Sequence, residues 1–318
     1  MNRLVNTANL SHEEWLEYRR KGIGGSDAGA ICGLNPWRTA IDVYVDKTKE
    51  KVDEIADNEA MRVGRDLEEY VAQRFIEATG KRVHKVNAIM QHDEYDFMLA
   101  NVDRKIGGEN AYLECKTTNA YKAKEWEDGK VPESYEIQCH HYMAVTGADA
   151  VYIACLIMGI DFVIVKIERN EAVINDLIKI ETDFWNNNVL KKVMPPPDGS
   201  EAAKDIINEI YTVTKSDDEV IDMSDDENKL TRIDELEELI GNLKTEQEQL
   251  KQELMIRMGE FETGYIKDRK ITWKMQNGKT SIDTKRLKAE CPEIYDEYMK
   301  VGEPYRVFRI AKKKKGDE

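Results

Sequence analysis

Apolar and polar positions follow two different periods along the first 200 residues. A period of three to four residues, typical of amphipathic helices, covers residues 11–20, 58–79, 133–146 and 171–193. Strand-like composition covers residues 82–90, 97–105, 111–117, 150–158 and 162–168. The glycine-rich residues 22–29 lead into a further short helix, and Gly107 and Gly108 predict a hairpin turn. This order of elements predicts an α/β (mixed α+β) fold with a central mixed sheet flanked by helices.

A different pattern follows in the last third of the chain. The seven-residue repeat of a coiled coil runs through Ile233, Leu236, Ile240, Leu243, Gln247, Leu250 and Leu254. We call these residues the heptad stripe. They indicate either a long helix that packs on its own chain or a coiled coil between subunits. Residues 265–274 and 305–311 alternate like strands, and residues 283–300 predict another helix.

Composition divides the chain into three zones. A chain of 318 residues has room for about two domains, and the prolines at 195–197 interrupt regular structure. Residues 1–200 carry a net charge of −9, residues 201–264 of −12 and residues 265–318 of +6. We therefore expect a main domain at 1–200, an acidic linker with the long helix at 201–264, and a basic accessory module at 265–318. Together the last two form a helical or coiled-coil extension with a small α/β part.

Several protein classes are excluded by composition. No apolar run approaches the roughly 18 residues of a membrane span, and the N-terminal residues lack a signal-peptide core, which predicts a cytoplasmic protein. The five cysteines contain no CxxC pair, which argues against a disulfide scaffold, a zinc finger or an iron–sulfur cluster. The total charge of −15 counts against an acidic partner such as DNA. However, most of this charge lies in residues 201–264.

Two strands joined by the Gly107–Gly108 turn carry the candidate chemistry. Asp103 lies near the end of the first strand, while Glu114 and Lys116 share one face of the second, because side chains alternate along a strand. Two carboxylates bind a hard cation such as Mg²⁺, and a lysine holds water or offsets negative charge on a phosphoryl group. Cys115 points to the opposite face, so only its backbone carbonyl is expected to join the metal site. Taken alone, however, E-x-K is more often a solvated charged face.

Further segments sharpen this interpretation. Asp103, Glu114-x-Lys116 and the downstream Gln138-x-x-x-Tyr142 resemble the PD-(D/E)xK nuclease core. Residues 15–28, 64–68 and 131–147 are similar to segments of the YqaJ-like viral recombinases, a branch related to phage lambda exonuclease. The resemblance covers roughly residues 10–195 in the family's order. Val102 stands where the motif's name has proline.

The resemblance implies a role for each matching residue. It makes Asp103 and Glu114 metal ligands, Lys116 the catalytic lysine, Glu68 a supporting carboxylate, and Gln138 a residue that orients the lysine region or the phosphate. Arg19 and Ser26 match a pocket for the 5′-terminal phosphate, and Arg20 is an adjacent candidate for it. A guanidinium, a hydroxyl and glycine-rich backbone N–H groups suit a phosphate dianion.

Other residues have weaker claims to function. His140 and His141 are neighbours on a helix and diverge by about 100°, so packing or a DNA contact is favoured over metal binding. Trp37 is expected to be a core anchor rather than a base-stacking wedge. Lysines 312–315 form either a DNA-backbone contact or a solvated tail.

The resemblance therefore predicts a Mg²⁺-dependent exonuclease, with Mn²⁺ as a possible substitute, that degrades linear duplex DNA from the 5′ end. It implies mononucleotide products, 3′ overhangs and a phage-type single-strand annealing partner. It also implies a homo-oligomer, a trimer by analogy, encoded by a phage or prophage in a bacterial cytoplasm without membrane contact. An endonuclease on the same core and a non-catalytic recombination adaptor are the alternatives.

Overall fold

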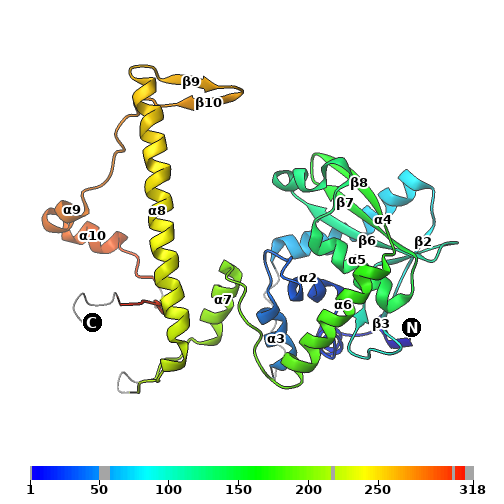
Figure 1. The fold of residues 1–318 in the computed structure, drawn as a ribbon. Coiled ribbons are helices and arrows are strands. Elements are labelled where there is room, and N and C mark those ends of the chain that lie inside the picture. Colours follow the sequence, from blue (N-terminus) through cyan, green and yellow to red (C-terminus); the bar gives the residue numbers. More distant parts are fainter. Residues whose placement is uncertain (1, 50–57, 216–218, 303–304, 312–318) are drawn as a thin grey trace. The chain divides into compact units, whose positions relative to one another are not determined.

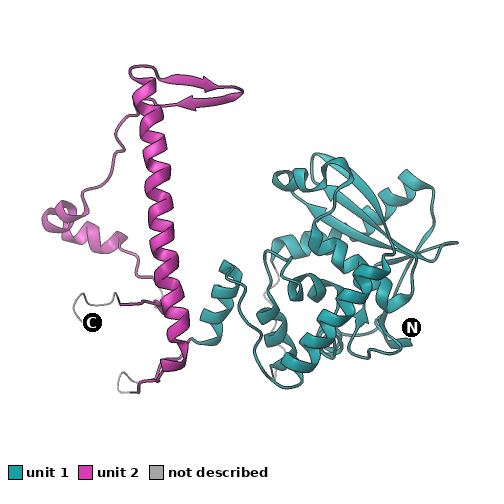
Figure 2. Cartoon of the chain, viewed as in Figure 1, with its two compact units in different colours: residues 1–211 teal, residues 212–318 magenta. Residues whose placement is uncertain are grey.

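The computed structural model describes residues 2–49, 58–215, 219–302 and 305–311. Two compact units divide the chain, residues 1–211 and residues 212–318 (Figure 2). The first boundary lies eleven residues beyond the one expected at 200, because α7 (Glu201–Ile210) buries Ala203 and Ile206, the latter in a cluster with Ile41 and Val45 of α3.

Figure 1 shows the helices of unit 1, several of which begin or end at a local cap. Its other helices are α1 (His12–Arg20), α2 (Gly25–Ile31), α3 (Ala40–Thr48), α4 (Glu59–Thr79), α5 (Glu133–Thr146) and α6 (Glu171–Asp183), with the short helices η1 (Ala120–Gly129) and η2 (Phe184–Val189). Ser11 caps α1 in a capping box with Glu14, and Gly80 ends α4 in the left-handed conformation.

Two sheets run through unit 1. The larger has the order β2-β5-β6-β7-β8, built from β2 (Val83–Lys85), β5 (Arg104–Ile106), β6 (Ala111–Thr118), β7 (Ala150–Ile157) and β8 (Asp161–Glu168). Only its β6–β7 pair is parallel, as the α5 crossover requires. The smaller sheet has the order β1-β3-β4, built from β1 (Asn2–Asn6), β3 (Ala88–Gln91) and β4 (Leu99–Ala100). The mixed sheet flanked by helices confirms the predicted fold class.

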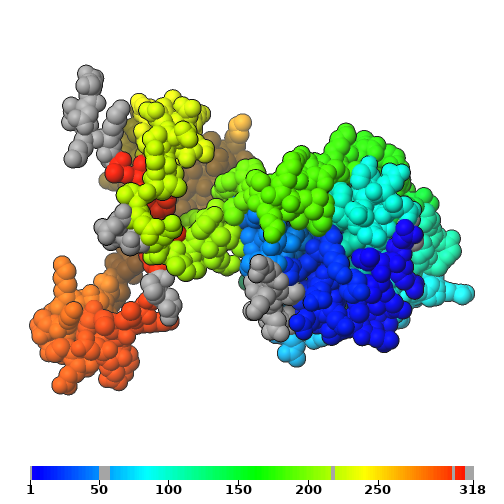
Figure 3. Space-filling view, turned by 90° about the horizontal axis from the view of Figure 1, so that it is seen from below, coloured from blue at the N-terminus to red at the C-terminus, as the bar shows by residue number. Residues whose placement is uncertain are grey.

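Hydrophobic residues fill both faces of the larger sheet. Along β7, Val151 and Ile153 join the cluster that includes Met143 of α5, while Ala150 and Ala154 join the one that includes Phe75 of α4. This alternation places α4 and α5 on opposite faces. Segments distant in sequence also meet, since α2 contacts α6 and α3 contacts η2. Figure 3 shows blue residues of the N-terminal part and green residues near position 180 on one face.

Several predicted elements are interrupted. The strands expected at 82–90 and 97–105 each split between the two sheets, which leaves Asp103 at the point where the chain passes from β4 to β5. The helix expected over 171–193 is α6 followed by the wider turns of η2. The elements β1, α3 and η1 were not predicted, because each is short and lacks a clear apolar period.

Unit 2 is built around one long helix (Figure 1). It contains η3 (Ser224–Asp226), α8 (Glu227–Met258), β9 (Thr263–Ile266), β10 (Arg269–Thr272), α9 (Thr284–Glu290) and α10 (Pro292–Tyr298). The strand expected at 265–274 is thus a hairpin, and the helix expected at 283–300 breaks before Pro292, which cannot donate a backbone hydrogen bond. Residues 305–311 form no strand, so that prediction was wrong. Lysines 312–315 lie outside the described residues.

Among the helices that the structure describes, none combines the length and the apolar composition needed to cross a bilayer. The helix α8 is long enough, but its surface is largely charged.

Candidate active site

Asp103, Glu114 and Lys116 meet at the edge of β6, just before the chain enters β5. The β5–β6 ladder begins at Arg104 opposite Leu113. Beyond it, the backbone N–H of Cys115 donates to Oδ2 of Asp103 at 2.8 Å, so the side chain replaces a missing strand partner. Because the N–H and C=O of one strand residue point the same way, the Cys115 carbonyl also faces the Asp103 side. The chain passes from the smaller sheet to the larger one at Asp103, so the edge of β6 beyond Leu113 has no strand partner among the described residues.

Gln138 of α5 links the two functional side chains of β6. Oε1 of Glu114 accepts from Lys116 Nζ at 2.7 Å and from Gln138 Nε2 at 2.7 Å, while Lys116 also donates to Gln138 Oε1 at 3.1 Å. Gln138 Nε2 is in addition 2.8 Å from the hydroxyl of Tyr142, which donates to the carbonyl of Asn101. The Q-x-x-x-Y pair thus holds the lysine and glutamate from the α5 face.

Burial and charge shift two pKa values in this cluster. Burial, followed by repulsion from Glu114, raises the pKa of Asp103 well above its usual value. Burial alone would lower the pKa of Lys116, but Glu114, together with Tyr135 and Asp103, outweighs burial and holds that pKa above its usual value. Lys116 is therefore an ammonium at neutral pH in this structure, and it donates to Glu114 and Gln138.

The carboxylates leave acceptor capacity for a cation. Oε2 of Glu114 is buried and has no hydrogen-bond partner, and such an atom is costly unless a cation or water binds it. The described residues contain no group of three His, Cys, Asp or Glu side chains arranged as metal ligands. Two carboxylates and one backbone carbonyl nevertheless suit Mg²⁺, which keeps several waters and often takes only one or two carboxylates. The residues present therefore fit this cation.

Glu68 approaches the same edge from α4, on the opposite face of the sheet. Its carboxylate pairs with Arg104, whose side chain is only 3% exposed and also binds Glu69 at 2.9 Å. The charge of Glu68 still contributes to the raised pKa of Asp103. The structure thus places Glu68 near the cluster but engaged with Arg104. Sequence reasoning missed this arginine, although it directly follows Asp103.

Arg19 and Ser26 share one cavity with Asp103. Nη2 of Arg19 donates to Oγ of Ser26 at 2.9 Å, and the guanidinium lies over the ring of Trp15 with its carbon 4.6 Å from the centroid. A cavity of about 190 Å³ is lined by Trp15, Arg19, Gly24, Gly25, Ser26, Ile89, Leu99, Asn101, Asp103, Gln138 and Tyr142. Its walls join the predicted phosphate residues to Asp103.

Gly25 in the glycine-rich turn lets α2 pack closely against α5. A Cβ at Gly25 would approach the ring of Tyr142 to 2.5 Å, so only glycine allows α2 to pack this tightly against α5. Asp27, in the first turn of α2, is fully buried and pairs with Lys47 at 2.8 Å and with Arg38. Sequence reasoning missed this ion-paired carboxylate. Such partners leave no periodic signal in the sequence.

Arg20 is not part of the cavity. Its Nε donates to the carbonyl of Asp46 at 2.8 Å and its Nη2 to that of Lys49, so it binds the carbonyls at the end of α3. Arg19 and Arg20 therefore have separate surroundings, despite being neighbours in the sequence.

The weaker candidates also find clear places. His141 is buried between Glu181, 2.8 Å from its Nδ1, and the carbonyl of Leu99, so it is a packing residue of the core. Trp37 is 74% exposed, with Lys122 Nζ 4.7 Å from its ring centroid, so the expectation of a core anchor was wrong. The turn formed by Asn35 holds its backbone at the surface.

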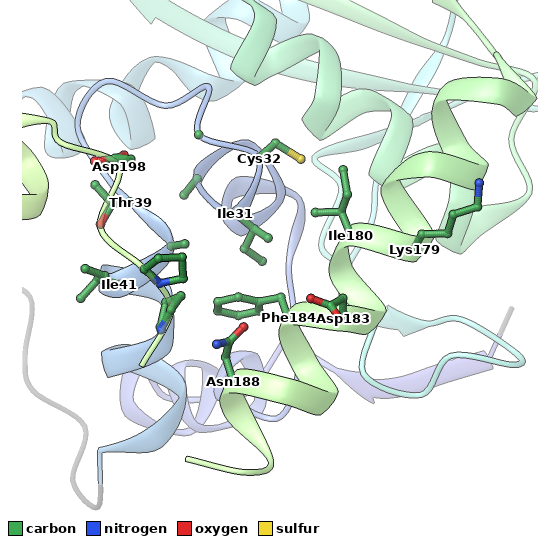
Figure 4. Close-up of a pocket in the computed structure, with 15 residues that line it drawn as sticks. Ile31, Cys32, Thr39, Ile41, Lys179, Ile180, Asp183, Phe184, Asn188 and Asp198 are labelled. Carbon is green, nitrogen blue, oxygen red and sulfur yellow. The ribbon is translucent and has the colours of Figure 1, made fainter. Parts of the chain in front are cut away.

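A second cavity lies away from this chemistry. Figure 4 shows it between α2, α3, α6 and the segment that carries Asp198. Its volume is about 500 Å³. Its walls are mainly apolar, including Ile31, Ile180 and Phe184, and contain none of the predicted site residues. It therefore does not contribute to the candidate active site.

Magnesium should stabilise unit 1 against heat. Since binding to the folded state alone adds about 1.4 kcal/mol at ten times the dissociation constant, we expect the Tm to rise by about 3–6 °C. Differential scanning fluorimetry with and without MgCl₂ measures this shift. Asp103→Asn should abolish it, whereas Asp176→Asn, an exposed carboxylate on α6, should not. An equal shift in both variants would place the cation elsewhere.

Comparisons with known proteins agree with this picture. Residues 14–149 match the YqaJ-like viral recombinase domain. The protein YqaJ of Bacillus subtilis (strain 168), which is described as uncharacterized, is 40% identical over 299 residues, or 93% of each chain.

Two solved structures of one protein are also similar. The alkaline exonuclease LHK-Exo from Laribacter hongkongensis is 19% identical, with a TM-score of 0.48. Its complex with dAMP is 20% identical, with a TM-score of 0.50. Both matches cover 62% of this chain and 99% of the other. At this identity, the second match shows a shared fold.

Proposed function

Because the chain belongs to the YqaJ-like viral recombinase family, we propose that it is a Mg²⁺-dependent exonuclease that degrades linear duplex DNA from the 5′ end. One observation carries the proposal: Arg19 and Ser26 line the same cavity as Asp103 and Gln138. A nuclease that cuts anywhere in a duplex has no need of a phosphate-binding pocket beside its carboxylates. An enzyme that acts from an end does.

We assign each site residue a role from its position. Asp103, Glu114 and the Cys115 carbonyl would hold the cation, with Glu68 as a more distant negative charge. The bound cation would polarise the phosphodiester and lower the pKa of a water. Lys116, fixed by Glu114 and Gln138, would donate to the phosphoryl oxygens or position that water. Arg19 and Ser26 would bind the terminal phosphate, and Mn²⁺ would be a possible substitute for Mg²⁺.

The central test compares substrates of equal sequence. Purified protein with MgCl₂ is incubated with linear 5′-phosphorylated duplex and with the same DNA as a closed circle. We expect mononucleotides and a 3′-overhanging strand from the linear DNA, and no cutting of the circle. Equal cutting of both would favour the endonuclease. Cutting of neither, with Mg²⁺ or Mn²⁺, would favour the adaptor.

Arg19→Ala should remove the preference for phosphorylated ends. A hydrogen bond to a charged group contributes about 1.5–3 kcal/mol, so cleavage of 5′-phosphorylated DNA should fall about 10- to 100-fold, while cleavage of 5′-hydroxyl DNA should change little. The ratio of kcat/KM for the two ends is the measurement.

Arg20→Ala is the matched control for this experiment, since it removes the adjacent guanidinium, which binds the end of α3. It should keep the wild-type preference. If both variants lose it equally, the pocket is not the phosphate site.

The 3′ overhang produced in this way would be the substrate of a single-strand annealing protein. We propose such a protein as the functional partner, with this chain acting as a homo-oligomer in a bacterial cytoplasm. Pull-down of a phage-type annealing protein by the full chain tests the partnership.

A further inference from the structure

The heptad stripe of α8 is an unpartnered apolar surface. Its isoleucines and the leucines at 236, 243 and 250 are between 36% and 64% exposed, and no residue of α8 is buried among the described residues. The helix spans 32 residues, or about 48 Å. We propose that the stripe joins two copies of this chain in a parallel, in-register coiled coil.

The residue types of the stripe favour two parallel strands. When Ile233 begins a heptad at position a, the isoleucines occupy a and all leucines but Leu254 occupy d. Isoleucine at a with leucine at d packs best in a parallel dimer. The outward positions are mostly polar, including Asp234, Glu238 and Gln249, which leaves one face for a partner.

Charges beside the stripe match this arrangement. In a parallel pair, Arg232 at position g faces Glu237 at position e of the other copy, and Glu246 faces Lys251. Each pair occurs twice by symmetry, and no like charges meet. Arg232 now pairs with Glu235 and Lys251 with Glu248 on exposed helix surface, where such ion pairs contribute little.

Gln247 distinguishes the two possible directions. In the parallel arrangement it lies opposite Gln247 of the other copy, so the two amides can bond to each other. In an antiparallel arrangement that places a opposite d, it would lie against Leu236, where its buried amide would lack a partner. The antiparallel alignment also leaves Leu254 opposite Lys229.

The mass of the full-length protein tests the association. Multi-angle light scattering should give a wild-type mass twice that of Leu236→Glu/Leu243→Glu. Ile256→Glu is the matched control, because Ile256 is equally apolar and 81% exposed but lies off the stripe; its mass should equal that of wild type. Far-UV circular dichroism checks that the helix persists. An unchanged mass in the double variant overturns the proposal.

Cross-linking and charge exchange test the direction. Leu250→Cys in a Cys291→Ser background should form a disulfide between copies on oxidation, whereas antiparallel helices would hold these positions about 25 Å apart along the axis. Glu246→Lys should weaken the dimer, and adding Lys251→Glu should restore it. Absence of the cross-link or of the restoration overturns the parallel arrangement. None of these residues belongs to the proposed active site, so nuclease activity on DNA can fail independently of this result.

Discussion

Replacing Lys116 with methionine should slow DNA cleavage by about 10²- to 10³-fold, the usual cost of removing one donor that stabilises charge in a transition state. The ammonium is held by Glu114 and Gln138 and borders Tyr135, 4.6 Å from the ring centroid. Methionine keeps a similar length without the charge. The rate should be measured in single turnovers at saturating enzyme and Mg²⁺, so that DNA binding and product release do not mask the chemical step.

Lys166→Met provides the matched control. Lys166 lies on β8 in the same sheet and pairs with Glu168 at 3.0 Å, so it repeats the lysine–glutamate spacing of Lys116 and Glu114 at a more exposed place. Its loss should leave the rate unchanged. If Lys116→Met cleaves as fast as Lys166→Met, the pair on β6 is a charged strand face and nothing more.

Local patterns predicted the elements on which the site is built. The predicted hairpin turn at Gly107 and Gly108 depends on interactions within a few residues, and the structure contains it, along with the equally local capping box at Ser11 and the helix end at Gly80. Strand alternation also placed Glu114 and Lys116 on one face, where their side chains meet. These features follow from short-range geometry, which a sequence displays directly.

Long-range pairings did not follow from the sequence in the same way. Asp103 occupies the break between two sheets, and nothing in its neighbourhood indicates that the chain changes sheet there. Arg104 with Glu68, and Asp27 with Lys47, join residues 36 and 20 positions apart. Trp37 shows the opposite failure, since a large aromatic residue is usually buried and here a local turn holds it out.

The distribution of charge also gains a physical meaning from the structure. Unit 2 carries most of the acidic segment, but its basic residues offset much of that charge, so residues 212–318 have a net charge of −4 and residues 1–211 of −11. In unit 1, carboxylates gather around a position suited to a cation. Binding of a divalent ion would offset part of this local repulsion. Net charge over a whole chain is therefore a poor guide to the partner of one site.

Asp27→Asn should destabilise unit 1 by about 3–5 kcal/mol, because it removes the nearest and only fully buried carboxylate that the buried ammonium of Lys47 contacts among the described residues. Lys47 is only 1% exposed, and Asp27 binds it at 2.8 Å while also accepting from the backbone of Gly24 at 3.0 Å. Asparagine preserves the shape but not the charge. Equilibrium urea denaturation followed by tryptophan fluorescence measures the loss, since four of the five tryptophans lie in unit 1.

Asp46→Asn is the matched control, because it removes an equal charge from a more exposed position. Asp46 contacts the same two cations, at 3.3 and 3.2 Å, but is 35% exposed, so its loss should cost less than about 1 kcal/mol.

Burial acts to raise the pKa of Asp27, but Lys47 and Arg38 outweigh it and hold that pKa far below its usual value. The carboxylate therefore stabilises the fold fully above the unfolded-state pKa of about 3.9, and this contribution declines as the pH falls further. Wild type should accordingly lose stability below about pH 4 more steeply than Asp27→Asn, and parallel curves for the two proteins would show that this carboxylate is not ionised in the fold.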